Sequence, residues 1–147
     1  MHRGDGTIES VLEEYAAAVG AKDVDRFVAL YAGDVRVFDM WGRWSYHGAD
    51  AWRAVAADWF GSLGSERVAV EFDDIQTVVG DEVAVAHGFV TFRGLAADGA
   101  ELRAMSNRFT WALRKTVDGE WKVVHEHSSA PAEFDTGKVQ LERQAAE

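Results

Sequence analysis

The stretch of sequence that decides the fold is Val11–Gly42, VLEEYAAAVGAKDVDRFVALYAGDVRVFDMWG. Apolar residues recur three and four positions apart over Thr7–Ala21, which predicts a helix that Thr7 caps. Asp23 is placed to cap a second helix that continues to Tyr31. Over Val35–Trp41 the apolar residues alternate, as they do along a strand. The stretch therefore predicts two helices followed by a strand.

The rest of the chain changes from helical spacing to alternation. Ala49–Leu63 has the spacing of a third helix. After it, runs rich in β-branched residues predict four strands, Val68–Val79, Val83–Arg93, Leu102–Lys115 and Trp121–Ser128, joined by turns such as Asp118-Gly119. Helices segregated from a run of antiparallel strands indicate the α+β class. We expect a curved antiparallel sheet with three helices on its concave face and a small-molecule cavity between them.

Length and composition bound the remaining possibilities. The chain has 147 residues, of which 48% are hydrophobic and 27% charged, as in ordinary globular proteins. We expect one domain, residues 1–131, and a charged tail or short helix at residues 132–147. Met1–Gly6 has no apolar run of a signal peptide, and no stretch reaches transmembrane length. These observations predict a soluble, cytoplasmic protein.

Charge and cysteine content exclude several functions. The net charge of −10 repels phosphate backbones and anionic lipids, so we expect neither a nucleic-acid nor a membrane partner. The absence of cysteine excludes disulfides and thiolate chemistry. No phosphate-binding loop, dinucleotide glycine motif or Ser-His-Asp order is present. We therefore expect no cofactor and no metal.

Two resemblances cover almost the whole chain. Val11–Gly42 resembles the opening of bacterial ketosteroid isomerases, in which a helix tyrosine donates a hydrogen bond to the substrate oxygen and a strand aspartate moves the proton. Tyr15 and Asp39 fall at those positions without a gap. HGADAWR, His47–Arg53, looks like the loop-to-helix entry of the wider nuclear-transport-factor-2-like (NTF2-like) superfamily. The resemblance implies a cone-shaped, cystatin-like fold.

The second half is similar to a different branch of that superfamily. DGEWKVVHEHSSAP, Asp118–Pro131, resembles the closing strand of the association domain of calcium/calmodulin-dependent kinase II. Arg108, in SNRFTW, looks like an arginine that points into the pocket of that domain. SnoaL-like polyketide cyclases belong to the same superfamily. The isomerases also use a protonated aspartic acid, and here Asn107, Arg108 or Thr110 falls at its position, depending on register.

Asp39 and Tyr15 are the first candidates for chemistry. Asp39 shares a strand face with Val35 and Val37, so a cavity on that face would hold a desolvated carboxylate, which is a better base. The alternative is a structural aspartate that pairs with Arg108. The Tyr15 hydroxyl could stabilise an oxyanion. Its alternative is a core tyrosine with the hydroxyl at the edge.

His125 and His127 are two residues apart on a strand, so they are expected to point the same way. With His87 they could cluster and either hold a ligand carboxylate or supply a general acid. The pair has ligand types that zinc accepts, but no further ligand at a fixed spacing supports a metal. The alternative is a structural pair, or a pair that faces a dimer interface.

Arginines and aromatic residues complete the expected pocket. Arg103 and Arg108 lie on opposite faces of one strand, and the resemblance favours Arg108 in the cavity. The aromatic wall and mouth are expected from Trp41, Trp44, Tyr46, Trp59 and Phe60, with residues 42–44 as a flap. The complete set of expected ligand-binding residues is Trp41, Trp59, His87, Asn107, Arg108 and His127.

The sequence supports two functions. The first is a cofactor-free isomerase, dehydratase or cyclase for a small, largely apolar carbonyl compound. Asp39 would be its base and Tyr15 its hydrogen-bond donor, assisted by Asn107 or Arg108 and by His125 or His127. The second is a ligand-binding or oligomerisation module without chemistry. Apolar residues on the convex face of a curved sheet predict a homodimer in either case.

Overall fold

The computed structural model describes residues 7–143, which form three helices and six strands. In chain order the elements are α1 (Ile8–Ala21), α2 (Val24–Val28), β1 (Tyr31–Phe38), β2 (Tyr46–His47), α3 (Ala49–Ser62), β3 (Arg67–Val79), β4 (Val83–Leu95), β5 (Glu101–Lys115) and β6 (Trp121–Ser129). The stretch predicted to lack a signal peptide, residues 1–6, and the last four residues of the predicted tail lie outside the described part.

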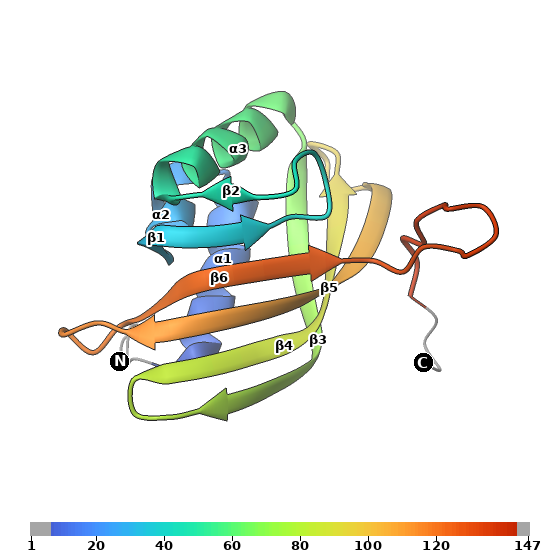
Figure 1. Cartoon of the computed structure of the whole chain (residues 1–147). Helices are drawn as coiled ribbons and strands as arrows, with labels where there is room; N and C mark the ends of the chain where they lie inside the picture. The colour runs from blue at the N-terminus through green and yellow to red at the C-terminus, as the bar shows by residue number, and fades with distance from the viewer. Residues whose placement is uncertain (1–6, 144–147) are drawn as a thin grey trace.

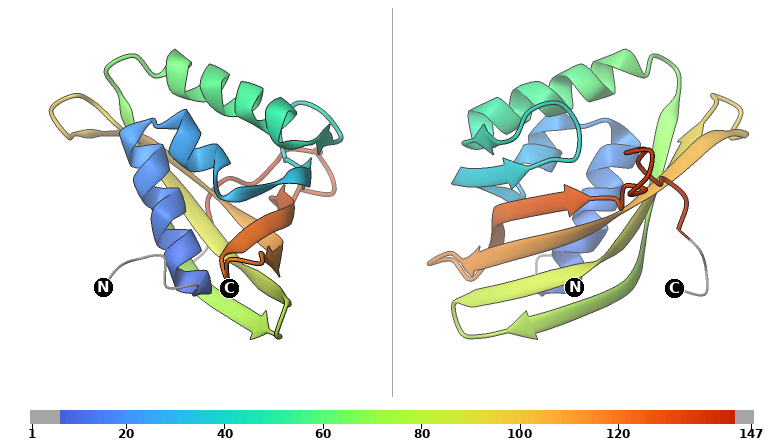
Figure 2. Two further views of the ribbon diagram at one scale, coloured as in Figure 1. Left: turned by 90° about the vertical axis from the view of Figure 1, so that its left-hand side faces the viewer. Right: turned by 45° about the vertical axis from the view of Figure 1, so that its right-hand side comes forward.

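The strands form one strongly curved sheet, and all three helices lie on its concave side (Figures 1 and 2). The strand order is β2-β1-β6-β5-β4-β3. This confirms the α+β class and the curved sheet. One pair differs from the antiparallel expectation, because β1 runs parallel to β6. No tight turn joins these two strands, so no hairpin forces them to be antiparallel.

The helix starts agree with the predicted caps. The Thr7 side chain accepts a hydrogen bond from the Ser10 N–H, and Asp23 accepts one from the Arg26 N–H. The second helix is shorter than predicted and ends at Val28. The reason is sheet pairing, since the Val123 N–H donates to the Leu30 carbonyl at 2.9 Å and Tyr31 already belongs to β1.

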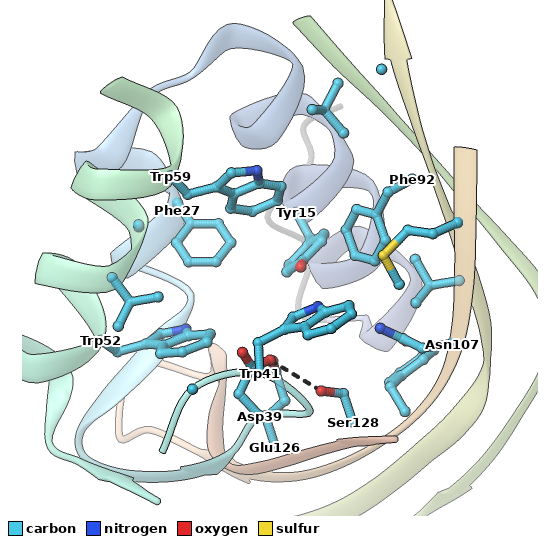
Figure 3. Close-up of a pocket in the computed structure, with 18 of the residues that line it drawn as sticks. Tyr15, Phe27, Asp39, Trp41, Trp52, Trp59, Phe92, Asn107, Glu126 and Ser128 are labelled. Carbon is cyan, nitrogen blue, oxygen red and sulfur yellow. Dashed lines mark hydrogen bonds between the residues drawn. The ribbon is translucent and has the colours of Figure 1, made fainter. Parts of the chain in front are cut away.

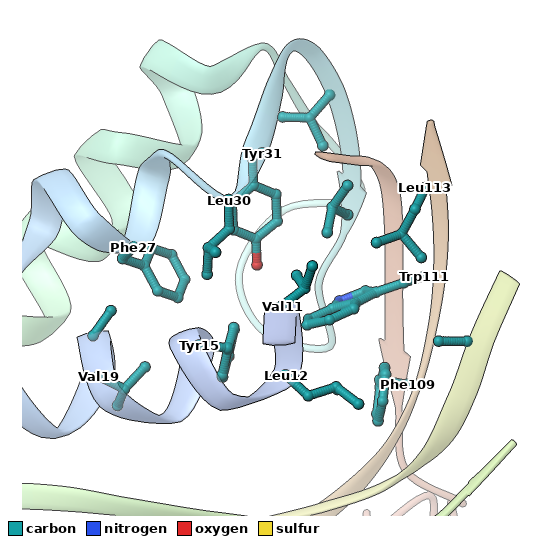
Figure 4. Close-up of a cluster of buried hydrophobic side chains, with 14 of the residues drawn as sticks. Val11, Leu12, Tyr15, Val19, Phe27, Leu30, Tyr31, Phe109, Trp111 and Leu113 are labelled. Atoms are coloured by element: carbon teal, nitrogen blue, oxygen red, sulfur yellow. The ribbon is translucent and has the colours of Figure 1, made fainter. Parts of the chain in front are cut away.

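A cluster of aromatic rings fastens α1 and α2 to the sheet (Figure 4). The Tyr15 ring lies 5.3 Å from Phe27 and 5.7 Å from Trp111, centroid to centroid, in tilted arrangements. Such pairs contribute both buried area and a favourable edge geometry. Tyr15, Phe27 and Trp111 also line a cavity, so the cluster bounds that cavity on one side.

β-bulges shape the sheet, and those in β3 and β6 bear most on the site. In β3 the register shifts between Asp73 and Gln76, and Asp74 adopts a positive φ of 52°. In β6 the residue opposite Ala112 is His125 and the residue opposite Leu113 is Val123, so Val124 is the extra residue. Bulges bend a strand and change which face the following side chains occupy.

The β3 bulge needs a glycine on the neighbouring strand. A Cβ at Gly88 would lie 2.7 Å from Ile75 Cδ1 and 2.9 Å from the Asp74 carbonyl oxygen. We expect Gly88→Ala to lower the free energy of unfolding by about 1–3 kcal/mol, as overpacked cores do. The measurement is urea unfolding.

Gly61→Ala is the matched control, because a Cβ at Gly61 meets no atom within 4 Å. It lies inside α3, where alanine should be neutral or add up to about 1 kcal/mol. Equal unfolding midpoints for the two variants would contradict the role assigned to Gly88.

The described part of the tail contains no helix. Residues 131–140 form a hairpin-like loop, in which the Gln140 N–H donates to the Pro131 carbonyl and Ala132 bridges Val139. The loop projects from the end of β6 (Figure 1), and Phe134 at its turn is fully exposed. Among residues 7–143, no helix is long and apolar enough to cross a membrane.

Candidate functional site

A cavity of about 640 Å³ lies between the helices and the concave face of the sheet (Figure 3). α1 supplies Tyr15, α3 supplies Trp52 and Trp59, and the strands supply the opposite wall. The lining is mostly apolar, with the rings of Tyr15, Phe27, Trp41, Tyr46, Trp52, Trp59, Phe72, Phe92, Phe109 and Trp111. A volume of this size suits a drug-sized molecule.

Asp39 lies in the cavity wall directly after β1 and is held in place by Ser128. The Ser128 hydroxyl donates to Asp39 Oδ1 at 3.1 Å and accepts from the Met40 N–H at 3.2 Å (Figure 3). Burial raises the pKa of the Asp39 carboxyl, and the hydrogen bond from Ser128 acts in the opposite direction. The carboxylate is therefore oriented and only partly desolvated, as a general base requires.

Glu126 is a second carboxyl group in the cavity, which sequence analysis missed. It comes from β6 and is buried, and its Oε1 accepts from the Tyr31 hydroxyl at 2.5 Å and from Trp111 Nε1 at 2.9 Å. Because both donors use Oε1, Oε2 is left for a ligand. Burial raises the pKa of Glu126 to about 7, the two hydrogen bonds oppose that rise, and the nearby charge of Asp39 adds to it.

Tyr15 reaches the same region from the opposite side. Its side chain is buried, and its hydroxyl points into the cavity (Figure 3). Burial raises its pKa well above the ordinary value, with further contributions from the charges of Glu126 and Asp39. The phenol therefore keeps its proton at neutral pH and can act only as a hydrogen-bond donor or acceptor.

The structure settles the register of β5. Asn107 lines the cavity, whereas Arg108 and Thr110 are exposed on the convex face. Asn107 Nδ2 donates weakly to Met40 Sδ at 3.4 Å, and its Oδ1 is buried without a partner within residues 7–143. A buried acceptor without a donor is costly, so a ligand hydroxyl or N–H at this point would be stabilising.

The histidines do not line the cavity, which corrects the expectation for all three. The Val124 bulge reverses the alternation of β6, so Glu126 and Ser128 face inward while His125 and His127 face outward. His125 Nδ1 bonds to the Arg36 carbonyl at 2.8 Å. His87 is exposed on the convex side of β4. The inward roles predicted for these residues therefore have no geometric support.

The prediction that Arg108 points into the cavity is also wrong. It donates to Ser129 Oγ at 2.8 Å and does not pair with Asp39. Arg103, on the other face of the same strand, lines the cavity edge and forms an ion pair with Glu66 at 2.5 Å. The alternative in which Arg108 holds Asp39 ionised is thereby removed.

Three of the five aromatic residues predicted to form the wall and mouth line the cavity. Trp41, Tyr46 and Trp59 line the cavity, and Trp41 remains half exposed at its edge. Trp44 is almost completely exposed and does not contribute to the wall. Phe60 packs in the hydrophobic core instead. Among the described residues, no group of three His, Asp or Glu side chains is arranged to hold a metal ion.

Comparison with known proteins identifies the family of this chain. A model of the SnoaL-like domain matches residues 8–133. No curated protein matches the chain.

Solved structures agree on the fold. An NTF2-like protein of unknown function from Pseudomonas putida KT2440 superposes with a TM-score of 0.80 at 26% identity, over 93% of both chains. A putative calcium/calmodulin dependent protein kinase II association domain from Xanthomonas campestris has a TM-score of 0.72 at 19% identity, over 91% of this chain and 99% of that one. A putative aromatic ring hydroxylase from Novosphingobium aromaticivorans has a TM-score of 0.62 at 20% identity, over 82% and 84%.

Proposed function

The chain belongs to the SnoaL-like domain family of NTF2-like proteins, and from its cavity we propose a cofactor-free acid/base enzyme for a small, largely apolar carbonyl compound. The observation that carries the proposal is a pair of carboxyl groups, Asp39 and Glu126, at the polar end of an otherwise aromatic cavity. Both have a raised pKa caused first by burial. Perturbed carboxyl groups in a cleft are typical of general acids and bases.

The proposed reaction moves a proton next to a carbonyl group. Asp39 removes a proton from the carbon beside the carbonyl, and the electron pair moves onto the carbonyl oxygen. The Tyr15 hydroxyl donates a hydrogen bond to that oxygen as it gains charge. Returning the proton to another carbon gives isomerisation, and loss of a neighbouring hydroxyl as water gives dehydration. No redox partner is needed for either outcome.

Glu126 and Asn107 determine which polar groups of a ligand this site can bind. Neutral Glu126 can present its Oε2 proton as a donor or as the acid that protonates a leaving hydroxyl. Asn107 Oδ1 lacks a donor among the described residues and would accept one from the ligand. The favoured ligand therefore has a flat, apolar body, a carbonyl oxygen and a hydroxyl.

A proton-exchange experiment tests the proposal. Tetralone, cyclohexenone and a steroid ketone are incubated with the protein in deuterated water, and NMR follows deuterium uptake beside each carbonyl. We expect uptake above the buffer rate for at least one compound, and we expect saturating N-phenylnaphthylamine, a neutral fluorophore, to suppress it. If the fluorophore binds but no compound exchanges, the proposal of chemistry fails and the binding function remains.

The second candidate is an assembly module, with a homodimer as the smallest assembly. It is supported by the uncovered valines Val78, Val79 and Val83 at the β3–β4 hairpin, each more than half exposed. The similarity to an association domain concerns the fold alone. Light scattering coupled to gel filtration separates the candidates, since a dimer is compatible with an enzyme and a larger ring favours assembly.

A further inference from the structure

The C-terminal segment closes an edge of the cavity that the sheet leaves open. β6 ends at Ser129, which pairs with Arg108, so the earlier residues of β5 have no strand on that side. Residues 140–143, which we call the clasp, return from the projecting loop to this edge. There the Ser106 N–H donates to the Leu141 carbonyl at 2.8 Å.

The clasp contacts both faces of the sheet at this edge. On the concave face the Leu141 side chain forms part of the cavity wall. The chain bends at Glu142 and crosses the edge. On the convex face the Arg143 guanidinium lies 3.8 Å from the centroid of the Phe89 ring, and its Nη1 lies 2.8 Å from Asp73 Oδ2. Leu141 and Arg143 thus contact opposite faces of the same sheet edge.

The anchor is weak enough to open. Asp73 is 68% exposed and Arg143 23% exposed in their ion pair, and exposed pairs are largely screened by water and salt. Arg143 Nε is buried with no hydrogen-bond partner among the described residues. The hydrogen bond from Ser106, the stacked cation and this exposed ion pair hold the clasp to the sheet far less firmly than the full ladders hold β3 to β6. Segments with so few contacts are the first to open in native proteins.

We propose that the clasp is the gate through which the ligand enters and leaves the cavity, and that Leu141 is a wall residue that selects ligands only when the gate is closed. The inference rests on the ligand-binding part of the proposed function and is independent of the chemistry. A gate makes a specific kinetic prediction: loosening it accelerates both association and dissociation. Loss of an ordinary wall contact accelerates dissociation alone.

Stopped-flow fluorescence with N-phenylnaphthylamine tests the gate in the full-length protein. We expect Arg143→Gln and Asp73→Asn each to raise both rate constants by roughly five- to tenfold, the size of a weak surface anchor. The double variant should be no faster than the faster single variant, because the two residues form one anchor. Lys138→Gln, an exposed cation of the projecting loop, should leave both rates unchanged.

Hydrogen exchange at Ser106 provides a readout that needs no ligand. Its amide is protected by the Leu141 carbonyl, so opening of the clasp exposes it. Arg143→Gln should speed exchange at Ser106 by the same factor and leave the central Trp111 amide unchanged. Leu141→Ala, compared with the exposed Leu102→Ala, should speed probe dissociation without changing association.

The outcomes separate this inference from the function on which it rests. If the wild-type protein does not bind the probe, the ligand-binding function fails and the gate with it. If it binds with rates and Ser106 exchange that Arg143→Gln leaves unchanged, the gate alone is wrong. If Arg143→Gln speeds exchange throughout β4 and β5, the residue stabilises the whole sheet and the gate is also wrong.

Discussion

Raising the pH from about 5 to about 8 is expected to cost the protein about 2–3 kcal/mol of stability through Glu126. The pKa of this carboxyl is about 7 in the folded protein, against an ordinary value of 4.5. Between these values the native state holds a proton that the unfolded chain has lost. Stability from this group is therefore complete at acidic pH and disappears as the pH rises through about 7.

Glu126→Gln isolates this contribution, because glutamine keeps an acceptor for Tyr31 and Trp111 and cannot ionise. Urea unfolding at a series of pH values should show the variant gaining on the wild type by about 2–3 kcal/mol between pH 5 and pH 8. Glu13→Gln, on the exposed face of α1, is the matched control and should follow the wild type. Parallel curves for wild type and Glu126→Gln would contradict the buried, protonated carboxyl.

Tyr31→Phe gives an independent check of the sign. The Tyr31 hydroxyl donates to Glu126 and lowers its pKa. Without this donor the carboxyl should ionise at a still higher pH, so the loss of stability should shift to more alkaline conditions. A shift toward acid would mean that the Tyr31 hydroxyl does not lower the pKa of Glu126.

Most of the fold was predictable because each strand buries one face and exposes the other. The alternation of apolar residues over Val68–Val79 and Val83–Arg93 predicted β3 and β4 to within two residues of the observed ends. Tyr31 was predicted as helical from the spacing of its neighbours in sequence. That spacing contains no information about the hydrogen bond that the distant Val123 N–H donates to the Leu30 carbonyl. Secondary structure that depends on such a partner is decided by packing rather than by local preference.

The candidate site was predictable in part, and the bulge in β6 hid the rest. Tyr15, on α1, and Asp39, directly after β1, both line the cavity. In β6, alternation from Val123 places the histidines inside, and one extra residue at Val124 places Glu126 there instead. The doubled valine, Val123-Val124, is the only local trace of this shift. A slip of one residue exchanges the two faces of a strand, so one missed bulge hid the buried acid.

Asp39→Asn is expected to reduce the rate of deuterium exchange by about 10²–10⁴-fold, the range for loss of a general base. Asparagine keeps an oxygen that can accept the Ser128 hydrogen bond, so the melting temperature should change little. Asp34→Asn is the matched control, since Asp34 lies exposed on β1, the strand that Asp39 follows, and pairs with Arg114. Full activity in Asp39→Asn would move the role of base to Glu126, and unfolding would make the aspartate structural.

The pH dependence of the rate separates the two carboxyl groups. If neutral Glu126 is the acid, the wild-type rate should fall as the pH rises through about 7, and Glu126→Gln should lose that fall together with part of the rate. Asp39→Asn removes a charge that raises the pKa of Glu126, so its alkaline fall should move to lower pH. The two variants should therefore change the alkaline fall in different ways. A rate that falls at the same pH in the wild type and both variants would exclude Glu126 as the acid while leaving Asp39 as the base.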